Sequence, residues 1–417
     1  MNKSDVIFFS FAIFSHFCCR FSLKISIIFN LSAFLMKVRK FSKLTIRIGK
    51  RRTNSKIRNC NFYMQQNKFL LAIVLLLTVL CTSCVQKKQV QDSPGVNVQV
   101  NAVAFYNLEN LFDTIDNEGV NDAEYLPNGT NKWGSLKYNS KLQRMAYAIS
   151  QIGIDQTPAG AALLGVSEIE NRLVLEDLVK QPEIKNRSYQ IVHFDGPDRR
   201  GVDVALLYNP RLFTVTNSKS YRLYTDDPNF LTRDQLMVSG YLQDEKVHII
   251  VNHWPSRSGG EMRSRPKRNA AAALTRSIVD SLHKTEPKAR IIVMGDLNDD
   301  PTNESCATIL GAKRDLNDVN PGDLYNVFWK TLESGIGSLA YNDQWNLFDQ
   351  IILSHQLSKG GKGNLRLWKS EVFYRNFLIQ QEGRYKGTPL RTHAGGVWLN
   401  GYSDHLPTVV YLIKETK

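Results

Sequence analysis

The stretch RIIVMGDLNDDP (290–301) begins with residues suited to a sheet core and ends with three aspartates and an asparagine. Charged side chains are rarely buried without a partner, because removing a carboxylate from water is costly. Taken alone, the segment fits an ordinary turn equally well, since Asp, Asn and Pro are common turn residues. A chemical site becomes the better interpretation only if other parts of the chain show the same pattern.

The pattern does recur, because nine polar side chains stand beside the ends of β-branched runs along the chain. Carboxylate and amide oxygens suit hard cations such as Mg²⁺, Mn²⁺ or Ca²⁺. Two histidines and no cysteine in the set argue against structural zinc. Each residue alone has an ordinary explanation, such as a turn cap or a satisfied core histidine, but the nine together predict a site. They are Asn107, Glu109, Glu168, His253, Asp296, Asn298, Asp349, Asp404 and His405.

The elements that would position these residues mix strands with helices. Helices are expected at 141–152 and 267–283, with Pro266 where the second helix starts. Because strands and helices do not strictly alternate, the order favours a compact α/β sandwich over a plain parallel sheet. Strands are expected at 100–113, 160–172, 201–210, 246–257, 290–294, 346–354 and 402–413.

Most of the positive charge lies in the first 63 residues. The 417-residue chain has a net charge of +14, and residues 1–63 hold 13 Lys and Arg against one acid, which leaves +2 for residues 64–417. The net charge of the main body therefore indicates no particular partner. Residues 1–63 also lack turn signals and an amphipathic period. We therefore expect 1–63 to be a spurious upstream extension, with Met64 as the true start.

Residues 64–84 have the pattern of a bacterial lipoprotein signal peptide. Lys68 precedes an apolar run over 69–79, and small residues stand directly before Cys84. The run is shorter than the ~20 apolar residues that a membrane span needs. Cys81 stands where such signals usually have Leu, and a single N-terminal membrane anchor is the alternative. The pattern predicts an exported lipoprotein held at the outer or cell-surface membrane of a bacterium through a lipidated Cys84.

The rest of the chain divides into a polar tether at 85–100 and one catalytic domain at 101–415. Five of the six cysteines precede residue 85. Cys306 alone belongs to the body, which excludes an internal disulfide and a thiolate metal cluster there.

With these residues in view, the sequence resembles the endonuclease/exonuclease/phosphatase superfamily, which includes deoxyribonuclease I, abasic-site endonucleases, sphingomyelinases and inositol-polyphosphate phosphatases. The resemblance runs from about Ala102 to Tyr411. Six motifs stand in the family's order: FYNLEN, GVSEIEN, VNHW, GDLND, LFDQIILS and YSDHLP. GDLND and YSDHLP are the most specific of the six. The resemblance implies a four-layer α/β sandwich, in which two packed mixed β-sheets are flanked by helices.

The resemblance also implies a role for each matched residue. His405 is the catalytic histidine and Asp349 the acid that holds it, while Asp296 and Asn298 orient the attacking water and the scissile phosphate. Asn107 contacts phosphate or metal. Glu168 is the principal metal ligand, with Asp404 and Glu109 as further acids beside the metal. His253 matches a second histidine that deoxyribonuclease I and the sphingomyelinases have and abasic-site enzymes lack, which disfavours a dedicated abasic-site repair role. Asp203 is the expected partner of His253.

These roles fit the chemistry of a phosphodiester, which is a stable anion. A divalent ion near Glu168 and Asp404 would polarise the phosphoryl oxygen and stabilise developing charge. His405 with an acid partner would act as a general base near neutral pH. His253 would stabilise the pentacovalent phosphorus or protonate the leaving oxygen. Mg²⁺ is the expected cofactor, with Mn²⁺ or Ca²⁺ as alternatives.

Two segments concentrate basic residues and suggest a substrate. Segment 256–268 has five basic residues against one acid, and we expect Arg257, Arg263 and Arg265 to contact substrate phosphates. Segment 355–395 has eight basic residues with interleaved aromatics, which either stack on bases or pack on the body. We therefore expect a nuclease with nucleic acid as substrate. A phosphoesterase for phospholipid headgroups or inositol phosphates, and a catalytically silent surface-binding lipoprotein, are the alternatives; no protein partner is implied.

Overall fold

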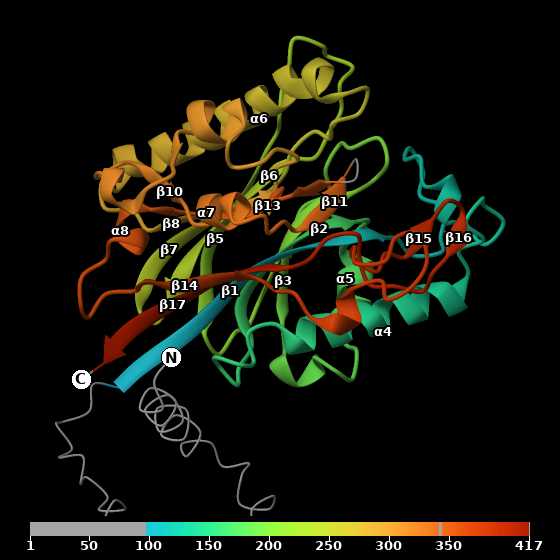
Figure 1. Cartoon of the computed structure of the whole chain (residues 1–417), viewed down its shortest axis with the longest axis horizontal. Coiled ribbons are helices and arrows are strands. Elements are labelled where there is room, and N and C mark those ends of the chain that lie inside the picture. Colours follow the sequence, from blue (N-terminus) through green and yellow to red (C-terminus); the bar gives the residue numbers. More distant parts are fainter. Residues whose placement is uncertain (1–96, 342–343, 417) are drawn as a thin grey trace, which may run out of the picture. The chain divides into compact units, whose positions relative to one another are not determined.

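The computed structural model describes residues 97–341 and 344–416, which lie in a unit spanning Pro94–Lys417 (Figure 1). The predicted upstream extension, the signal peptide with Cys84 and most of the tether fall on residues 1–96, outside the described residues. The first strand begins at Asn97, four residues before the expected domain boundary at 101. None of the described helices combines the length and apolar character that a membrane crossing requires.

The first sheet has six strands in the order β14-β17-β1-β2-β4-β3. Strands β1 and β2 are parallel and the other neighbours are antiparallel, so the sheet is mixed. The strands are β14 Arg366–Val372, β17 Thr408–Thr416, β1 Asn97–Leu111, β2 Ala161–Ile169, β4 Asp203–Tyr208 and β3 Gln190–His193.

The second sheet has seven strands in the order β5-β6-β7-β8-β13-β10-β9. It is also mixed, because β7 and β8 are parallel, as are β10 and β9. The strands are β5 Phe213–Tyr221, β6 Gln235–Leu242, β7 Glu245–His253, β8 Ile291–Asp296, β13 Asp349–Ser354, β10 Leu324–Asn326 and β9 Ala312–Lys313. Two small pairs complete the strands: β11 Leu339–Tyr341 with β12 Gln344–Asn346, and β15 His393–Ala394 with β16 Val397–Trp398.

Helices cover the outer faces of the two sheets. Helix α4 (Ser135–Gln151) and α5 (Arg172–Val179) pack on the first sheet, and α6 (Glu261–Thr285) lies along the second (Figure 1). The shorter helical segments are η1 Ala123–Tyr125, η2 Lys185–Arg187, η3 Ser305–Ile309, η4 Leu316–Asp318, α7 Trp329–Glu333, α8 His355–Ser358 and η5 Asn376–Leu378.

Strand β8 shows how the four layers are held together. Its side chains alternate between the faces of the sheet, so Ile292 and Met294 join the core between the sheets. Ile291 and Val293 join a second cluster under α6. A strand covered on both faces needs a continuous apolar run, which is what residues 291–294 supply. The predicted four-layer α/β sandwich with two packed mixed sheets is confirmed.

The starts of three expected elements differ from the structure by six residues each. Helix α6 begins at Glu261, after Gly259 and Gly260 with φ of 75° and 103°, so Pro266 lies inside the helix. The left-handed glycine pair, and not the proline, marks the start of this helix. Helix α4 begins six residues earlier than expected, at Ser135, and β17 begins at Thr408. Residues 402–407, including His405, therefore form an irregular segment before the strand.

Gly165 in β2 allows a close approach between the two sheets. A Cβ atom at this position would lie 2.5 Å from Met294 Sδ and 3.1 Å from Phe105 Cδ2. Met294 belongs to β8 of the second sheet, so any side chain at 165 would press on the facing layer. Packed interiors accommodate added volume poorly.

Gly165→Ala should lower the free energy of unfolding by about 1–3 kcal/mol, because the added methyl group overpacks the interface between the sheets. Urea denaturation of the full chain measures the change. Gly361→Ala is the matched control, since nothing lies within 4 Å of a Cβ built there; it should change stability by less than about 0.5 kcal/mol. Equal stabilities of the two variants would contradict this account of the packing.

Candidate active site

Asp296 is the residue on which the predicted site converges. Its Oδ2 accepts a hydrogen bond from Asn107 Nδ2 at 3.1 Å and lies 3.7 Å from His253 Nε2 and 3.9 Å from His405 Nε2. Asn107 belongs to β1 of the first sheet, and Asp296 ends β8 of the second. His253 ends β7, which runs parallel to β8 with His253 opposite Asp296. The site therefore forms where strand ends of both sheets meet.

His405 is fixed by Asp349, as the sequence predicted. The two side chains form a buried pair with His405 Nδ1 2.7 Å from Asp349 Oδ2. Asp349 begins β13, and its register partner on β8 is Asp296, so one ladder places both acids. This contact leaves the other ring nitrogen, Nε2, facing Asp296 and Asp404.

The irregular segment that carries His405 is anchored by backbone contacts. Leu406 N–H donates to the Ser338 carbonyl at 2.7 Å, and the Ser338 hydroxyl donates to Asp349. The Ser403 hydroxyl donates to the Asn107 carbonyl at 2.7 Å and accepts from the His405 N–H at 3.1 Å. Ser338 and Ser403 thus hold the histidine and its acid in place. Sequence reasoning missed them, since a serine in a loop carries no motif of its own.

Asn298 is held beside Asp296 by a tight turn. Its N–H donates to Asp296 Oδ1 at 2.9 Å, and its Nδ2 donates to the Trp254 carbonyl at 2.9 Å. The residue has a φ of 51°, a left-handed conformation that Asn tolerates better than most residues. The Asp-x-Asn spacing therefore has a conformational reason besides a chemical one.

Glu168 reaches the site through a bulge in β2. The pairing of β2 with β4 shifts register between Ser167 and Ile169, and Glu168 has a φ of 57°. Such bulges turn a side chain away from the regular alternation of a strand. Glu168 Oε2 accepts from the Asn110 N–H at 3.0 Å, and Oε1 lies 3.8 Å from His253 Nε2.

Glu109 lies in a buried cluster of charges beside the centre. Its Oε2 accepts from the Thr392 N–H at 2.6 Å and lies 3.9 Å from Lys141 Nζ, and its Oε1 is 3.4 Å from Arg391 Nε. Arg391 also pairs with Asp404 at 2.6 Å, so the two acids share one guanidinium. The sequence analysis missed Lys141, although a lysine within the buried face of an expected helix is a recognisable signal.

His253 has a different neighbourhood from the one expected. The predicted partner, Asp203, instead contacts His193 Nε2 at 3.2 Å and the Gly196 N–H at 3.1 Å, because β4 pairs with β3 at the edge of the first sheet. His253 Nδ1 is buried without a hydrogen-bond partner among the described residues. The His253 carbonyl accepts from Arg233 Nε at 3.2 Å.

The three predicted substrate-binding arginines have different surroundings. Arg257 donates to the Asn298 carbonyl at 2.9 Å and to Asp299 Oδ1 at 3.0 Å, so it braces the GDLND loop. Arg265 pairs with Glu261 one helical turn earlier. Arg263 is exposed and has no acidic partner among the described residues. Contact with substrate remains a prediction for all three.

The aromatic residues of segment 355–395 are partly packed on the body, and stacking on bases stays a prediction for the exposed ones. Phe373 is buried in the core, whereas Trp368, Tyr374 and Tyr385 remain about half exposed. Arg375 lies over the Phe373 ring, 4.0 Å from its centroid. The structure alone assigns no ligand to this surface.

Burial shifts several protonation equilibria at the site towards neutrality. It raises the pKa of Asp296 to about 7 and, with the nearby Asp404 charge, that of Glu109 to about 7. Burial also lowers the pKa of Lys141 to about 8 and that of His253 well below its ordinary value. For His405, burial opposes the imidazolium, but the Asp349 and Asp296 carboxylates outweigh it and raise the pKa well above the ordinary value.

The donor set fits a hard divalent cation. Glu168 Oε1 and Asp404 Oδ1 each lack a hydrogen-bond donor among the described residues, and both belong to side chains that are only partly buried. Carboxylate oxygens of this kind are the ligands that Mg²⁺ and Mn²⁺ prefer. The ligand atoms of Asp296, Asp349 and His405 also lie within 4.8 Å of one another. A bound cation near these carboxylates would oppose the upward shift of the His405 pKa.

Comparisons with known proteins identify a family and structures of similar fold. The sequence profile of the Endonuclease/Exonuclease/phosphatase family matches residues 102–414. No curated protein sequence matches the chain. The fold is similar to an endonuclease/exonuclease/phosphatase family protein from Bacteroides thetaiotaomicron (15% identity, 77% of this chain and 100% of that chain, TM-score 0.45). It is also similar to a mannosyl-6-phosphatase from the same species (14%, 75% and 99%, 0.46) and to D. rerio TDP2 complexed with single-strand DNA product (13%, 75% and 99%, 0.45).

The GDLND loop depends on a fully buried ion pair. Arg268 Nε lies 2.7 Å from Asp299 Oδ2, and Arg268 and Asp299 are 0% and 1% exposed. Arg268→Met should lower the free energy of unfolding by about 3–5 kcal/mol, because Asp299 then loses its closest cation while buried.

Arg265→Met on the same helix is the matched control, since the Arg265–Glu261 pair is partly exposed. It should cost less than about 1 kcal/mol. Chemical denaturation of both full-length variants measures the difference. Similar losses would show that the buried pair does not hold this loop.

Proposed function

The chain belongs to the endonuclease/exonuclease/phosphatase family and is a phosphoric ester hydrolase of that family; from this premise we propose that it is a divalent-metal-dependent nuclease acting on DNA or RNA. The proposal rests on one observation, which is that two histidines lie close to the same carboxylate. His253 and His405 both place Nε2 within 3.9 Å of Asp296 Oδ2. Two imidazoles beside one acid suit phosphodiester hydrolysis, which needs a proton transfer and stabilisation of the pentacovalent phosphorus.

Each side chain has a distinct task in this proposal. Asp349 holds the tautomer and orientation of His405 through Nδ1, so that Nε2 can exchange a proton at the reacting phosphate. Asp296 and Asn298 orient the attacking water, and Asn107 contacts a phosphate oxygen. His253 would stabilise the pentacovalent phosphorus through Nε2, because burial lowers its pKa and leaves the imidazole neutral. Glu168 and Asp404 would hold the cation, with Glu109 behind them.

The bound ion, Mg²⁺ in the first instance, would neutralise charge on the phosphate oxygens and stabilise the charge that develops there. Mn²⁺ or Ca²⁺ would suit the same oxygen ligands.

A nucleic-acid substrate is supported by charge beside the centre. The segment that follows His253 carries five basic residues between 256 and 268, of which Arg263 and Lys267 have no acidic partner among the described residues. The second histidine also distinguishes the chain from the abasic-site members of the family. A phosphoesterase acting on phospholipid headgroups or inositol phosphates is the alternative, since a headgroup also presents a phosphodiester. The convergence of the acids and histidines gives no support to a silent binding protein.

Export and lipidation belong to the same proposal. The signal-peptide pattern at 64–84 supports cleavage before Cys84 and anchoring through a lipid on that residue. Mass spectrometry of the native product tests it, because a mature protein beginning at a lipidated Cys84 contains no peptide from residues 1–83. Any peptide from 2–63 would overturn the assignment of Met64 as the start.

A panel of three phosphodiesters should separate the substrates. Plasmid DNA, sphingomyelin vesicles and bis(p-nitrophenyl) phosphate are each incubated with Mg²⁺ and with EDTA. We expect Mg²⁺-dependent nicking of the plasmid, slower hydrolysis of the chromogenic diester and no release of phosphocholine. Release of phosphocholine without nicking would favour the headgroup phosphoesterase.

Variants at the centre should separate proton transfer from metal binding. His405→Ala and Glu168→Ala should each lower turnover at least about 10²-fold with the fold intact. Excess Mg²⁺ or Mn²⁺ should partly restore Glu168→Ala, because a weakened ion site refills at high concentration. It should not restore His405→Ala. Near-normal rates in both variants, with circular dichroism as the control for folding, would disprove the site.

A further inference from the structure

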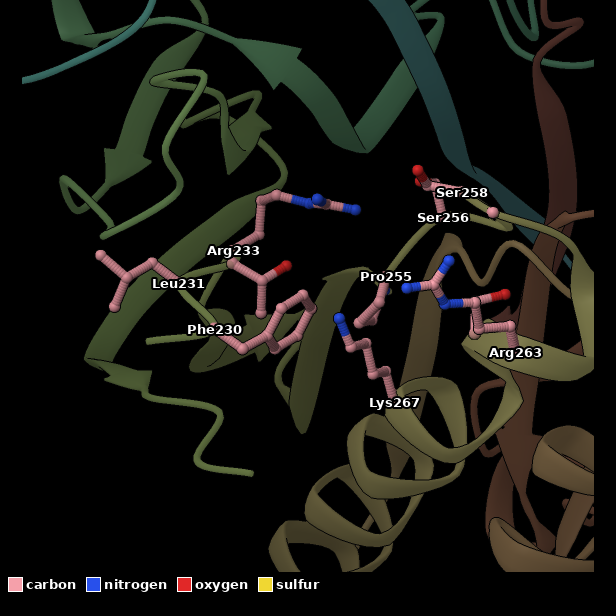
Figure 2. Close-up of a pocket in the computed structure, with 11 residues that line it drawn as sticks. Phe230, Leu231, Arg233, Pro255, Ser256, Ser258, Arg263 and Lys267 are labelled. Carbon is pink, nitrogen blue, oxygen red and sulfur yellow. The ribbon is translucent and has the colours of Figure 1, made fainter. Parts of the chain in front are cut away.

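A pocket of about 370 Å³ opens beside the catalytic cluster (Figure 2). Three segments line it: residues 230–233 before β6, residues 255–259 after β7, and the first turns of α6 at 263–267. Arg233 connects the pocket to the centre, since it donates to the His253 carbonyl at 3.2 Å and to the Trp254 carbonyl at 2.6 Å. The volume is within the range of small-molecule sites.

The pocket contains the unpaired cations of the basic segment 256–268. Three of the five basic residues there are neutralised, because Arg257 and Arg268 contact Asp299 and Arg265 contacts Glu261. Arg263 and Lys267 have no acidic partner among the described residues, and both line the pocket. Figure 2 shows them rising from the helix on one side, with Phe230 and Arg233 opposite. None of the lining residues is acidic.

A buried hydroxyl in the same pocket also lacks a partner. Thr232 is 2% exposed, yet its Oγ1 has no hydrogen bond within the described chain. Buried polar groups are nearly always satisfied, so an orphan of this kind requires an explanation. The hydroxyl itself has less than 1 Å² of exposed surface, so a ligand oxygen would reach it after a small shift of the side chain. Ser256 and Ser258 add two exposed hydroxyls to the lining.

The first turns of α6 border the same pocket through Arg263, Ser264 and Lys267. The helix has 25 residues and follows Gly260, which provides no side-chain cap. Its first N–H groups therefore have no capping oxygen, and the helix dipole adds positive potential there. A helix N-terminus of this kind, with cations and hydroxyls around it, is suited to a phosphate group.

We propose that this pocket binds a phosphate of the substrate strand that flanks the scissile one. The inference rests on the proposed function as a phosphodiester hydrolase and narrows its substrate to a chain with more than one phosphate. The three residues from His253 to Ser256 span at most ~10 Å. Phosphates follow one another every ~3.4 Å of axial rise along one strand of a duplex. A strand cleaved at the histidines therefore brings another phosphate within reach of Arg263 and Lys267.

Dinucleotides that differ by one terminal phosphate test the pocket. The KM of TpT is compared with those of pTpT and TpTp, in Mg²⁺ and with the full chain. One of the two phosphorylated forms should have a KM about tenfold lower than TpT, because two cations receive its extra phosphate. Equal KM values for all three would overturn the inference.

The double variant Arg263→Gln/Lys267→Gln should reduce the difference in KM between TpT and the favoured phosphorylated dinucleotide to less than about twofold. Lys284→Gln/Lys288→Gln is the matched control, since it removes the same two charges from exposed positions without acidic partners in the described chain. Lys284 lies about 25 Å along α6 from Lys267 at 1.5 Å per residue. The control should retain the difference in KM. If both variants lost the difference in KM, the effect would depend on the net charge of the protein and not on the pocket.

Thr232→Val separates a ligand role from a structural one. Valine has a similar shape and removes the unsatisfied hydroxyl, so the midpoint of urea denaturation should stay the same or rise. The KM of the favoured phosphorylated dinucleotide should rise several-fold. An unchanged KM would remove Thr232 from the pocket's ligands.

A binding measurement without turnover distinguishes failure of the pocket from failure of the proposed function. In EDTA, the affinity for a fluorescent thymidine 12-mer is measured by anisotropy against salt. The slope of log affinity against log salt should become shallower by about 0.7 in Arg263→Gln/Lys267→Gln, the loss of one single-strand phosphate contact. If no phosphodiester is cleaved but this change appears, the pocket stands and the nuclease proposal fails. If TpT is cleaved but the slope is unchanged, the pocket inference fails alone.

Glycerophosphoinositol bisphosphate tests the other source of a flanking phosphate. Its cleavage should be slow and should not depend on Arg263 and Lys267. The opposite result would be a low KM for this compound that rises in Arg263→Gln/Lys267→Gln, with equal KM values for the three dinucleotides. That result would assign the pocket to inositol phosphates and overturn the inference that it binds a nucleic-acid strand.

Discussion

The hydrogen bond from Asn107 to Asp296 joins the ends of the two sheets, and the geometry of the site depends on it. Asn107 lies near the end of β1 and Asp296 ends β8, and both strands lie in the middle of their sheets, so neither residue can move without the packed layers behind it. The interior is close-packed, since a Cβ atom added at Gly165 would lie only 2.5 Å from Met294 Sδ. If the layers slid past each other, Asn107 would separate from Asp296. The two histidines would then also lose their shared position beside the Asp296 carboxylate.

The three aspartates of residues 295–300, Asp296, Asp299 and Asp300, have different roles. Asp296 faces the centre, where burial raises its pKa to about 7. Asp299 is the anchor, held by Arg268 and Arg257, and the Asp300 carboxylate accepts from the Leu347 N–H at 2.7 Å. Two acids therefore secure the loop so that the third can stay buried without a strong cationic partner. The same arrangement occupies Arg257 and leaves Arg263 available.

Much of this arrangement could be predicted from the sequence, because strand ends and motif order follow from local chemistry. The strand ends around Asn107, Asp296 and His253 are of this kind. What escaped prediction depends on partners far away in the chain. Ser338 meets Asp349 through the fold alone, and the pairing of Asp203 with His193 follows from which edge strand lies beside β4. Pro266 was misleading, because a left-handed glycine pair upstream had already set the helix start.

The distribution of charge indicates where a cation is most needed. Glu109 and Asp404 already meet fixed cations, Lys141 and Arg391. Glu168 and Asp296, in contrast, have only histidines as basic side-chain partners within the described chain, and burial lowers the pKa of one of these, His253, well below its ordinary value. The neutral His253 adds no positive charge, and Asp296 shares the protonated His405 with Asp349. The deficit of positive charge therefore lies between Glu168 and Asp296, on the side of the centre where a divalent ion and a substrate phosphate would meet.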